Sequence, residues 1–274
     1  MTLSIKKCRL ATIAALLGLI VPVATGYAEP LDDLARAASQ GDLVAQFDLG
    51  MLYEHGSNDQ GLTVEQNYQE ALKWYRMVSD RGQTGVRVLI GMIYENGRYD
   101  SAGHDIPQDY TEAMKWYRSA ADHGNSSGQF MVANLYENGL GVEQDRKEAI
   151  KWYRMAAERG NASAQYTLGN RYHTGLGVIQ NYAEAMRFYR LAADQGLAKA
   201  QHQLGLLYWG DAGKGIPHDL VQAHLWLNLA ESQNTSDSPL IREQIQKLSR
   251  SMLPEKIRQA QELARNWKRV SRVQ

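Results

Sequence analysis

The chain has 274 residues, in which 30 Lys and Arg residues balance 30 Asp and Glu residues. It therefore lacks the basic excess typical of nucleic-acid-binding proteins, and we expect no nucleic-acid partner. Its single cysteine, Cys8, lies before the first apolar stretch. If that segment is removed on export, the mature chain has no thiol, which excludes disulfides, cysteine metal sites and cysteine nucleophiles.

The first 30 residues have the build of a secretory signal. Three basic residues precede an apolar run at residues 10–23, which is too short to span a bilayer comfortably. Gly26 and Ala28 are small residues that a signal peptidase can read, so we expect cleavage between Ala28 and Glu29. An uncleaved N-terminal anchor is the alternative. We interpret residues 1–28 as a signal peptide and expect a periplasmic or secreted protein of the bacterial envelope, with no transmembrane segment after cleavage.

One two-part unit recurs five times along the rest of the chain. Its first part has the form Ala-Gln-x-x-Leu-Gly-x-x-Tyr, and the tyrosines step by 41, 42, 36 and 36 residues. A fixed period of this size predicts a solenoid, because no single unit can bury its own apolar face. The tyrosines are Tyr53, Tyr94, Tyr136, Tyr172 and Tyr208, and the second parts begin at Glu70, Glu112, Glu148, Glu184 and Gln222.

Both parts of the unit are predicted to be helices. In the second part, Ala71, Trp74, Tyr75 and Val78 lie at i, i+3, i+4 and i+7 and form one apolar face. A capping Asn or Asp lies three residues before the start of each second part. A glycine marks the end of the second helix. A small residue in the first part is unfavourable for a helix, so we expect two backbones to cross closely there. These small residues are Gly50, Gly91, Ala133, Gly169 and Gly205.

Both ends of the repeat region are expected to be capped. Residues 34–50 align with residues 189–205, so the mature chain opens with the second helix of a truncated unit. In the fifth unit Leu225 and Leu227 replace a base and a tyrosine, which makes that helix apolar on more than one face. Two helices predicted to start at Ser238 and Pro254 are the best candidates to cover it.

Over residues 45–233 the chain resembles the Sel-one-like repeats, a subclass of tetratricopeptide-like helical repeats. The clearest match runs through the third and fourth units, where residues 138–145 match the family's glycine-rich inter-helix loop. The resemblance implies an all-α, right-handed α/α superhelical solenoid that binds proteins or peptides along a concave face. We therefore expect a solenoid at 29–233, with repeats at about 42–82, 83–124, 125–160, 161–196 and 197–233, followed by capping helices and a basic tail at 234–274.

The sequence contains no recognisable catalytic site. It has no nucleophile elbow, no His-Glu-x-x-His and no phosphate loop, so we expect neither an enzyme nor a bound cofactor. The seven histidines fall in different repeats without the spacing of metal ligands. We expect no metal site.

A ladder of basic residues recurs at the same two positions on four successive helices. Stacking of the repeats predicts a basic stripe, which an acidic polysaccharide could bind. Each first base lies three residues after a Glu that can neutralise it, so an ordinary solvated helix face is the alternative. The ladder comprises Lys73, Arg76, Lys115, Arg118, Lys151, Arg154, Arg187 and Arg190.

A second candidate surface is the position after the recurring tyrosine. Trp209 stands there in the fifth unit, and an aromatic side chain at an otherwise polar position can anchor a partner. It can equally pack under the longer fifth loop. Insertions near residues 56–63 and 98–106 lengthen the first two units on one rim and are also candidate contacts. In the other units the position after the tyrosine holds Glu54, Glu95, Glu137 and His173.

These patterns support three functional hypotheses. The first is an exported scaffold or adaptor that binds a protein or peptide partner and regulates an envelope assembly or signalling system. The second is a cell-wall or acidic-polysaccharide binding protein that uses the basic ladder. The third is a hydrolase on a repeat scaffold, against which the missing nucleophile argues.

Overall fold

The computed structural model describes residues 31–59, 61–99, 103, 105–210 and 218–269. The predicted signal peptide, with its cleavage site at Ala28 and Glu29, lies outside the described residues. So do most of the fifth loop and the last five residues of the predicted basic tail.

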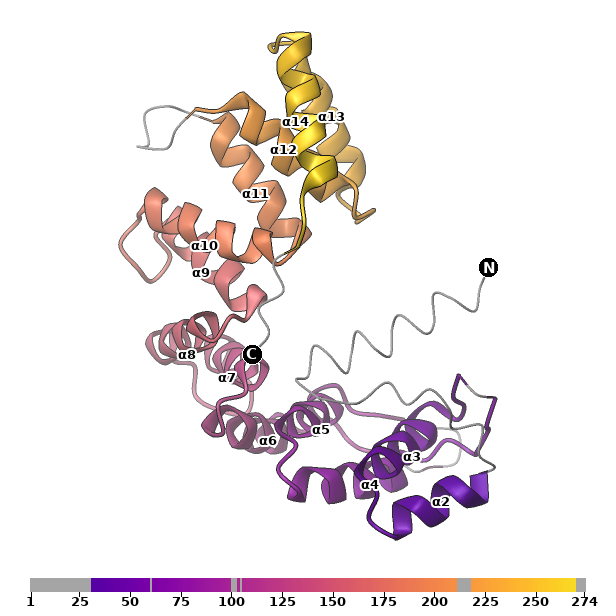
Figure 1. The fold of residues 1–274 in the computed structure, drawn as a ribbon. Helices are drawn as coiled ribbons and strands as arrows, with labels where there is room; N and C mark the ends of the chain where they lie inside the picture. Colours follow the sequence, from indigo (N-terminus) through magenta and orange to yellow (C-terminus); the bar gives the residue numbers. More distant parts are fainter. Residues whose placement is uncertain (1–30, 60, 100–102, 104, 211–217, 270–274) are drawn as a thin grey trace. The chain divides into compact units, whose positions relative to one another are not determined.

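The described residues form α-helices joined by turns and loops (Figure 1). The chain divides into two compact units, residues 1–149 and 150–274, and α8 spans the boundary. The helices are α2 (Leu31–Ser39), α3 (Leu43–His55), α4 (Tyr68–Asp80), α5 (Thr84–Asn96), α6 (Tyr110–Asp122), α7 (Ser126–Asn138), α8 (Arg146–Glu158), α9 (Ala162–Thr174), α10 (Tyr182–Asp194), α11 (Ala198–Trp209), α12 (Leu220–Glu231), α13 (Ser238–Ser249) and α14 (Pro254–Asn266).

Helices pack in the pairs that the repeat predicts. Within residues 1–149, α3 packs on α4 and α5 on α6, while α2 packs on α3 as the expected half-repeat. Within residues 150–274, α9 packs on α10, α10 on α11, and α11 on α12. The predicted all-α architecture of two-helix repeats is confirmed.

Local capping sets where the helices begin and end. The side-chain oxygens of Asn67, Asp109, Asp145, Asn181 and Asp219 each accept the backbone N–H three residues later, at 2.9–3.0 Å. After the second helices, glycines adopt positive φ, as predicted, because a side chain is disfavoured there. These glycines are Gly82 (+88°), Gly124 (+83°), Gly160 (+87°) and Gly196 (+83°).

The recurring small residue of the first helix makes room for a side chain of the second. A Cβ atom on Gly50 would lie 2.6 Å from the ring of Tyr75, and one on Gly169 would lie 2.6 Å from the ring of Tyr189. The expected steric reason is therefore present. The nearest group at these two glycines is an aromatic ring, whereas at Gly205 it is Leu227 together with the backbone oxygen of Ala223, 3.2 Å from the added Cβ. Close approach of the two backbones at the other positions stays a prediction.

A buried glutamine links successive helices, a role that the repeat pattern did not indicate. Gln165 is fully buried, and its Nε2 donates to the carbonyl oxygen of Ala157, near the end of α8, at 3.0 Å. The Ala157 carbonyl also accepts the backbone N–H of Gly160 at 3.0 Å, so the glutamine adds a second donor to a buried carbonyl near the helix end. The same bond, eight residues back, is made by Gln46 (3.0 Å), Gln129 (3.4 Å) and Gln201 (3.2 Å).

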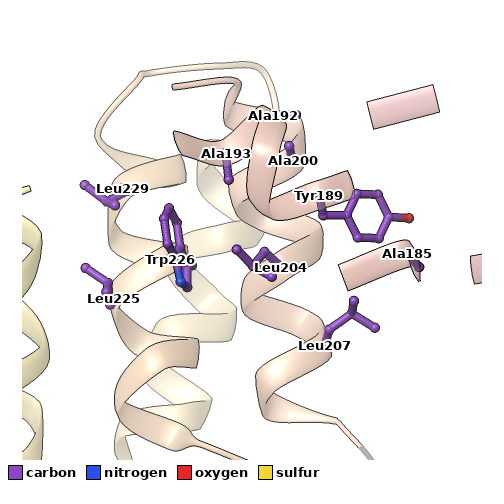
Figure 2. Close-up of a cluster of buried hydrophobic side chains, with 10 residues drawn as sticks. All are labelled: Ala185, Tyr189, Ala192, Ala193, Ala200, Leu204, Leu207, Leu225, Trp226 and Leu229. Carbon is purple, nitrogen blue, oxygen red and sulfur yellow. The ribbon is translucent and has the colours of Figure 1, made fainter. Parts of the chain in front are cut away.

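The C-terminal helices cover the apolar fifth unit, as predicted. Both α13 and α14 pack on α12, and Leu227 clusters with Ile241 and Leu248. On its other side, α12 contributes Trp226 to a core shared with α10 and α11 (Figure 2). His224 is 1% exposed and lies between α12 and α13, with Nε2 3.1 Å from Ser249 Oγ.

Replacing the buried glutamine should destabilise the fold. Gln165→Leu removes two hydrogen bonds, the one from Nε2 to the Ala157 carbonyl and the one that Oε1 accepts from Gln195 Nε2 at 2.8 Å. At about 0.5–1.5 kcal/mol for each bond, we expect the free energy of unfolding to fall by about 1–3 kcal/mol. Urea denaturation followed by circular dichroism measures this loss. The exposed Gln261→Leu is the control, expected to change stability by less than about 0.5 kcal/mol; equal effects would contradict the role of Gln165.

Acid should weaken the docking of α13 on α12. Burial lowers the pKa of His224, so the folded ring stays neutral where the unfolded chain binds a proton. The associated stability is complete above the unfolded pKa of about 6.5 and is lost as the pH falls below it. Urea denaturation above and below that pH should show a larger loss for the wild type than for His224→Gln, whereas the exposed His55→Gln should behave as wild type. If the free energy of unfolding of His224→Gln falls with acid as much as that of the wild type, His224 is not the cause.

Candidate functional site

The first bases of the ladder lie on exposed helix faces and pair with acids of the same helix. Lys151 and Glu148 hold the corresponding positions on α8. Exposed ion pairs of this kind stabilise by only about 0–1 kcal/mol, so a bound anion can replace the partner acid. The pairs are Lys73–Glu70 (3.2 Å), Lys115–Glu112 (2.7 Å) and Arg187–Glu184 (2.8 Å).

The second bases of the ladder fall into two groups. Arg76 and Arg154 each donate to the hydroxyl of the tyrosine that ends the following first helix, whereas Arg118 and Arg190 pair with an aspartate four residues later. Most of the predicted stripe is therefore already hydrogen-bonded within the protein. The contacts are Arg76–Tyr94 (2.7 Å), Arg154–Tyr172 (3.2 Å), Arg118–Asp122 (3.0 Å) and Arg190–Asp194 (3.0 Å).

Two ladder residues meet at a hollow of about 440 Å³ in the second unit, between α8, α9 and α10. Arg154 and Arg187 line it together with one acid, Glu158. Its volume is within the range of binding pockets for small molecules or single side chains. The rest of its wall is apolar or aromatic and comprises Ala157, Tyr172, Phe188 and Leu191.

The aromatic wall of the hollow is held in place by its neighbours. Tyr172 and Phe188 stack with centroids 5.7 Å apart and ring planes 7° apart. Arg154 donates to the Tyr172 hydroxyl, and the guanidinium carbon of Arg187 lies 4.1 Å from the Phe188 centroid. The hollow therefore presents an ordered apolar surface beside two cations, and can accept an apolar group joined to an anion.

Glutamates at the second candidate surface make bonds inside the repeat. Glu54 is 7% exposed, accepts the Tyr75 hydroxyl at 2.7 Å and lies 3.4 Å from Arg98. In the second repeat, Glu95 likewise accepts a hydrogen bond from the hydroxyl of Tyr117. Burial and these carboxylates raise the pKa of both tyrosines, which keeps each hydroxyl protonated as a donor. Contact of these glutamates with a partner stays a prediction.

In the third and fourth repeats the same position is half-buried, as Glu95 is in the second. Glu137 has an oxygen 3.8 Å from Arg146, and His173 has Nδ1 3.3 Å from the Tyr189 hydroxyl. The side chain at this position thus meets the tyrosine of the second helix again in the fourth repeat.

Trp209 packs in the C-terminal cap. It lies with Leu220 and Ile245 against the cluster that contains Leu227, and Lys247 Nζ is 5.9 Å from its ring centroid. Where other repeats pair tyrosine with an acid or histidine, the fifth has the apolar pair of Leu227 and Trp209. The structure thus gives Trp209 a packing role with α13, and its role as a partner anchor stays a prediction.

Each of the two loop insertions is closed by one antiparallel bridge, between Ser57 and Thr63 and between Arg98 and Ile106. Arg98 also reaches back to Glu54, so the second insertion is tied to the preceding repeat. Tyr99 remains 65% exposed beside it. A partner contact through these insertions stays a prediction.

In the described ranges, no three His, Cys, Asp or Glu side chains gather closely enough to hold a metal ion. Over the same ranges, the helices lack the length and apolarity needed to cross a bilayer.

The tyrosine–glutamate bond should contribute to stability. Tyr75→Phe keeps the ring but leaves the buried Glu54 without its hydroxyl donor, and we expect a loss of about 1–3 kcal/mol in the free energy of unfolding. Chemical denaturation at neutral pH measures it. Tyr99→Phe, at an exposed tyrosine, is the matched control; a Tyr75→Phe protein as stable as this control would show that the bond contributes nothing.

Comparison with known proteins gives concordant results. The sequence profile of the Sel1 repeat matches residues 43–83, 88–125, 126–161, 162–197 and 198–234. A Sel1 repeat protein from Oxalobacter formigenes is 29% identical with a TM-score of 0.64, over 88% of this chain and 95% of that one. A protective antigen of uropathogenic Escherichia coli with an SLR fold is 28% identical with a TM-score of 0.47, over 85% of this chain and 55% of that one. No curated protein sequence matches the chain.

The family profile and the Oxalobacter formigenes structure extend over most of the chain and agree with its packed helix pairs. The Sel1 repeat is a non-catalytic scaffold type that commonly serves protein–protein interaction. The chain belongs to the Sel1 repeat family.

Proposed function

We propose that this protein is an exported scaffold that binds a protein or peptide partner and regulates an assembly or signalling system of the bacterial envelope. The observation that carries the proposal is the hollow between α8, α9 and α10, where Arg154 and Arg187 flank the stacked rings of Tyr172 and Phe188. Aromatic residues and arginine are the side chains enriched at the centres of protein interfaces.

The chemistry of the hollow favours a protein partner over an acidic polysaccharide. A polysaccharide would bind along the whole ladder, whose bases pair with acids or tyrosines, the two bases of the hollow included, so pairing does not separate the candidates. The hollow instead combines two cations with an apolar wall, which suits a side chain more than a sugar acid. Binding of cell-wall glycan along the ladder is therefore the second candidate and an outcome of the test.

Export is supported by the first 28 residues, whose basic start, short apolar run and small-residue exit are typical of a cleaved signal. We expect the protein in the periplasm or the medium, with Glu29 at its N-terminus. Cell fractionation and mass spectrometry of the recovered N-terminus measure this. A chain that keeps Met1 and remains in the cytoplasm would overturn the export part of the proposal.

Partner capture tests the binding surface. The double variant Arg154→Ala/Arg187→Ala should lower recovery of a cross-linked envelope protein about tenfold or more, because two buried-interface arginines contribute more than about 1.4 kcal/mol. Quantitative mass spectrometry of captured material provides the measurement.

A matched control exists at the counterpart of the hollow on α4, α5 and α6, where Arg76 and Lys115 occupy the same two positions. Arg76→Ala/Lys115→Ala should leave recovery unchanged. Equal recovery by both double variants would exclude the hollow as the contact. Recovery of glycan that salt releases, reduced alike by both variants, would favour the polysaccharide candidate.

A further inference from the structure

The chain itself fills the counterpart of this hollow one repeat further along. The repeat places corresponding residues between α10, α11 and α12, and a segment that follows α14 packs there. The occupied copy is thus a template for what the open copy can bind. The open hollow is lined by Arg154, Ala157, Glu158, Tyr172, Arg187, Phe188 and Leu191. The residues at the corresponding positions of the filled copy are, in the same order, Arg190, Ala193, Asp194, Tyr208, Leu225, Trp226 and Leu229.

Trp267 is the side chain that occupies this second copy. It is half-buried and packs, together with Ala264, against a core cluster. Figure 2 shows Leu225, Trp226 and Leu229 of this cluster. Its ring lies edge-to-face on Trp226, with centroids 6.4 Å apart and planes 77° apart. This arrangement is favourable for two aromatic rings.

Burial differs between the two copies in the way that occupancy predicts. In the filled copy, Leu225 is 7% exposed and Leu229 is 8% exposed. At the same positions of the open copy, Arg187 is exposed and Leu191 is only half-buried. Phe188 is already only 8% exposed, whereas Tyr172 is half-buried. An apolar side chain entering the open hollow would therefore remove mainly Leu191 and Tyr172 from water, which is favourable.

Charge also distinguishes the open hollow from the filled one. Arg190 and Asp194 pair at 3.0 Å in the filled copy, and Leu225 is neutral. In the open copy Arg187 replaces that leucine. Arg187 donates to Glu184 through Nε and Nη2. Its other amino nitrogen, Nη1, can donate to the carboxylate of a ligand. The open copy therefore suits an aromatic group with an adjacent carboxylate.

The second repeat does not offer the same surface. Ser119 stands there in the place of Leu191, and Arg87 donates to its carbonyl oxygen at 3.3 Å and to its hydroxyl at 3.2 Å. Ser79 and Ser119 thus stand in the places of Ala157 and Leu191, although Tyr94 and Trp116 keep the aromatic positions. An aromatic side chain entering there would displace hydrogen bonds at Ser119 instead of burying a leucine.

We propose that the hollow between α8, α9 and α10 recognises a peptide segment that carries an aromatic side chain next to an acidic residue, seated as Trp267 is seated one repeat along. This inference rests on the proposed function and names the chemistry of the partner. The aromatic group packs beside Phe188 and Leu191, and the carboxylate pairs with Arg187.

Short peptides test the two halves of the recognition separately. The probes are acetylated and amidated Glu-Trp-Glu, Gln-Trp-Gln and Glu-Ala-Glu, titrated into the purified full-length protein and followed by calorimetry and by NMR. Glu-Trp-Glu should bind about tenfold or more tightly than either other peptide, since each lacks an interaction worth about 1.4 kcal/mol or more. Equal binding of all three, or of Glu-Trp-Glu and Glu-Ala-Glu, would overturn the proposal.

Arg187→Leu converts the open hollow to the composition of the filled one. It should bind Glu-Trp-Glu and Gln-Trp-Gln equally, while Lys115→Leu, the equivalent change in the second repeat, should keep the wild-type preference. Leu191→Ser should remove the preference for Trp over Ala and provides a second variant if Arg187→Leu fails to fold. Wild-type preferences in both Arg187→Leu and Leu191→Ser would place binding elsewhere and overturn the proposal.

The peptide test and partner capture fail independently. If no peptide binds but capture still depends on Arg154 and Arg187, the aromatic–acidic inference is wrong and the scaffold proposal stands. If Glu-Trp-Glu binds as expected and capture does not depend on the hollow, the proposed contact with the envelope partner is wrong.

Discussion

A tyrosine ring lying against a glycine closes the helix pair in the first, second and fourth repeats, and the rest of the repeat depends on this contact. The glycine is unfavourable for a helix by about 1 kcal/mol, but any side chain at Gly50 or Gly169 would collide with the ring of Tyr75 or Tyr189. The ring carries its hydroxyl into a partly buried place, so the hydroxyl needs a partner; Glu54 supplies it in the first repeat and Glu95 in the second. The position after the recurring tyrosine is therefore constrained by the fold before any partner is considered.

The fifth repeat shows the effect of replacing this pair. Leu227 takes the place of the tyrosine, no buried hydroxyl requires an acceptor, and Trp209 can stand where the glutamate was. The resulting apolar helix α12 has to be covered on two sides. One side receives α13, and the other receives Trp267, which packs on Trp226. The change from a polar to an apolar pair thus converts a repeat into a cap.

Repetition with small changes also explains how one hollow becomes a candidate site. The copies that start on α4, α6, α8 and α10 share an arginine at this position, and Arg76 and Arg154 make the same bond to a tyrosine hydroxyl. The wall varies at a few positions. One holds Ser119 in the second repeat and Leu191 in the fourth, and another holds Arg187 in the fourth and Leu225 in the fifth. These exchanges decide whether the hollow is polar, open and cationic, or filled by the chain.

The sequence by itself determined the helix pairs, their capping residues and glycine ends, and the cover over the fifth unit, because these depend on contacts within a few residues or on a repeated apolar period. It also indicated a steric role for the small residue, although not the ring that fills the space. Tertiary structure alone decided that Glu54 and Glu95 bond to tyrosines, that Trp209 and Trp267 enter different apolar clusters, and that Arg154 and Arg187 share one hollow. A repeated sequence places equivalent bases at every step, and only the packed distances between helices distinguish a base paired on the surface from one that lines a site.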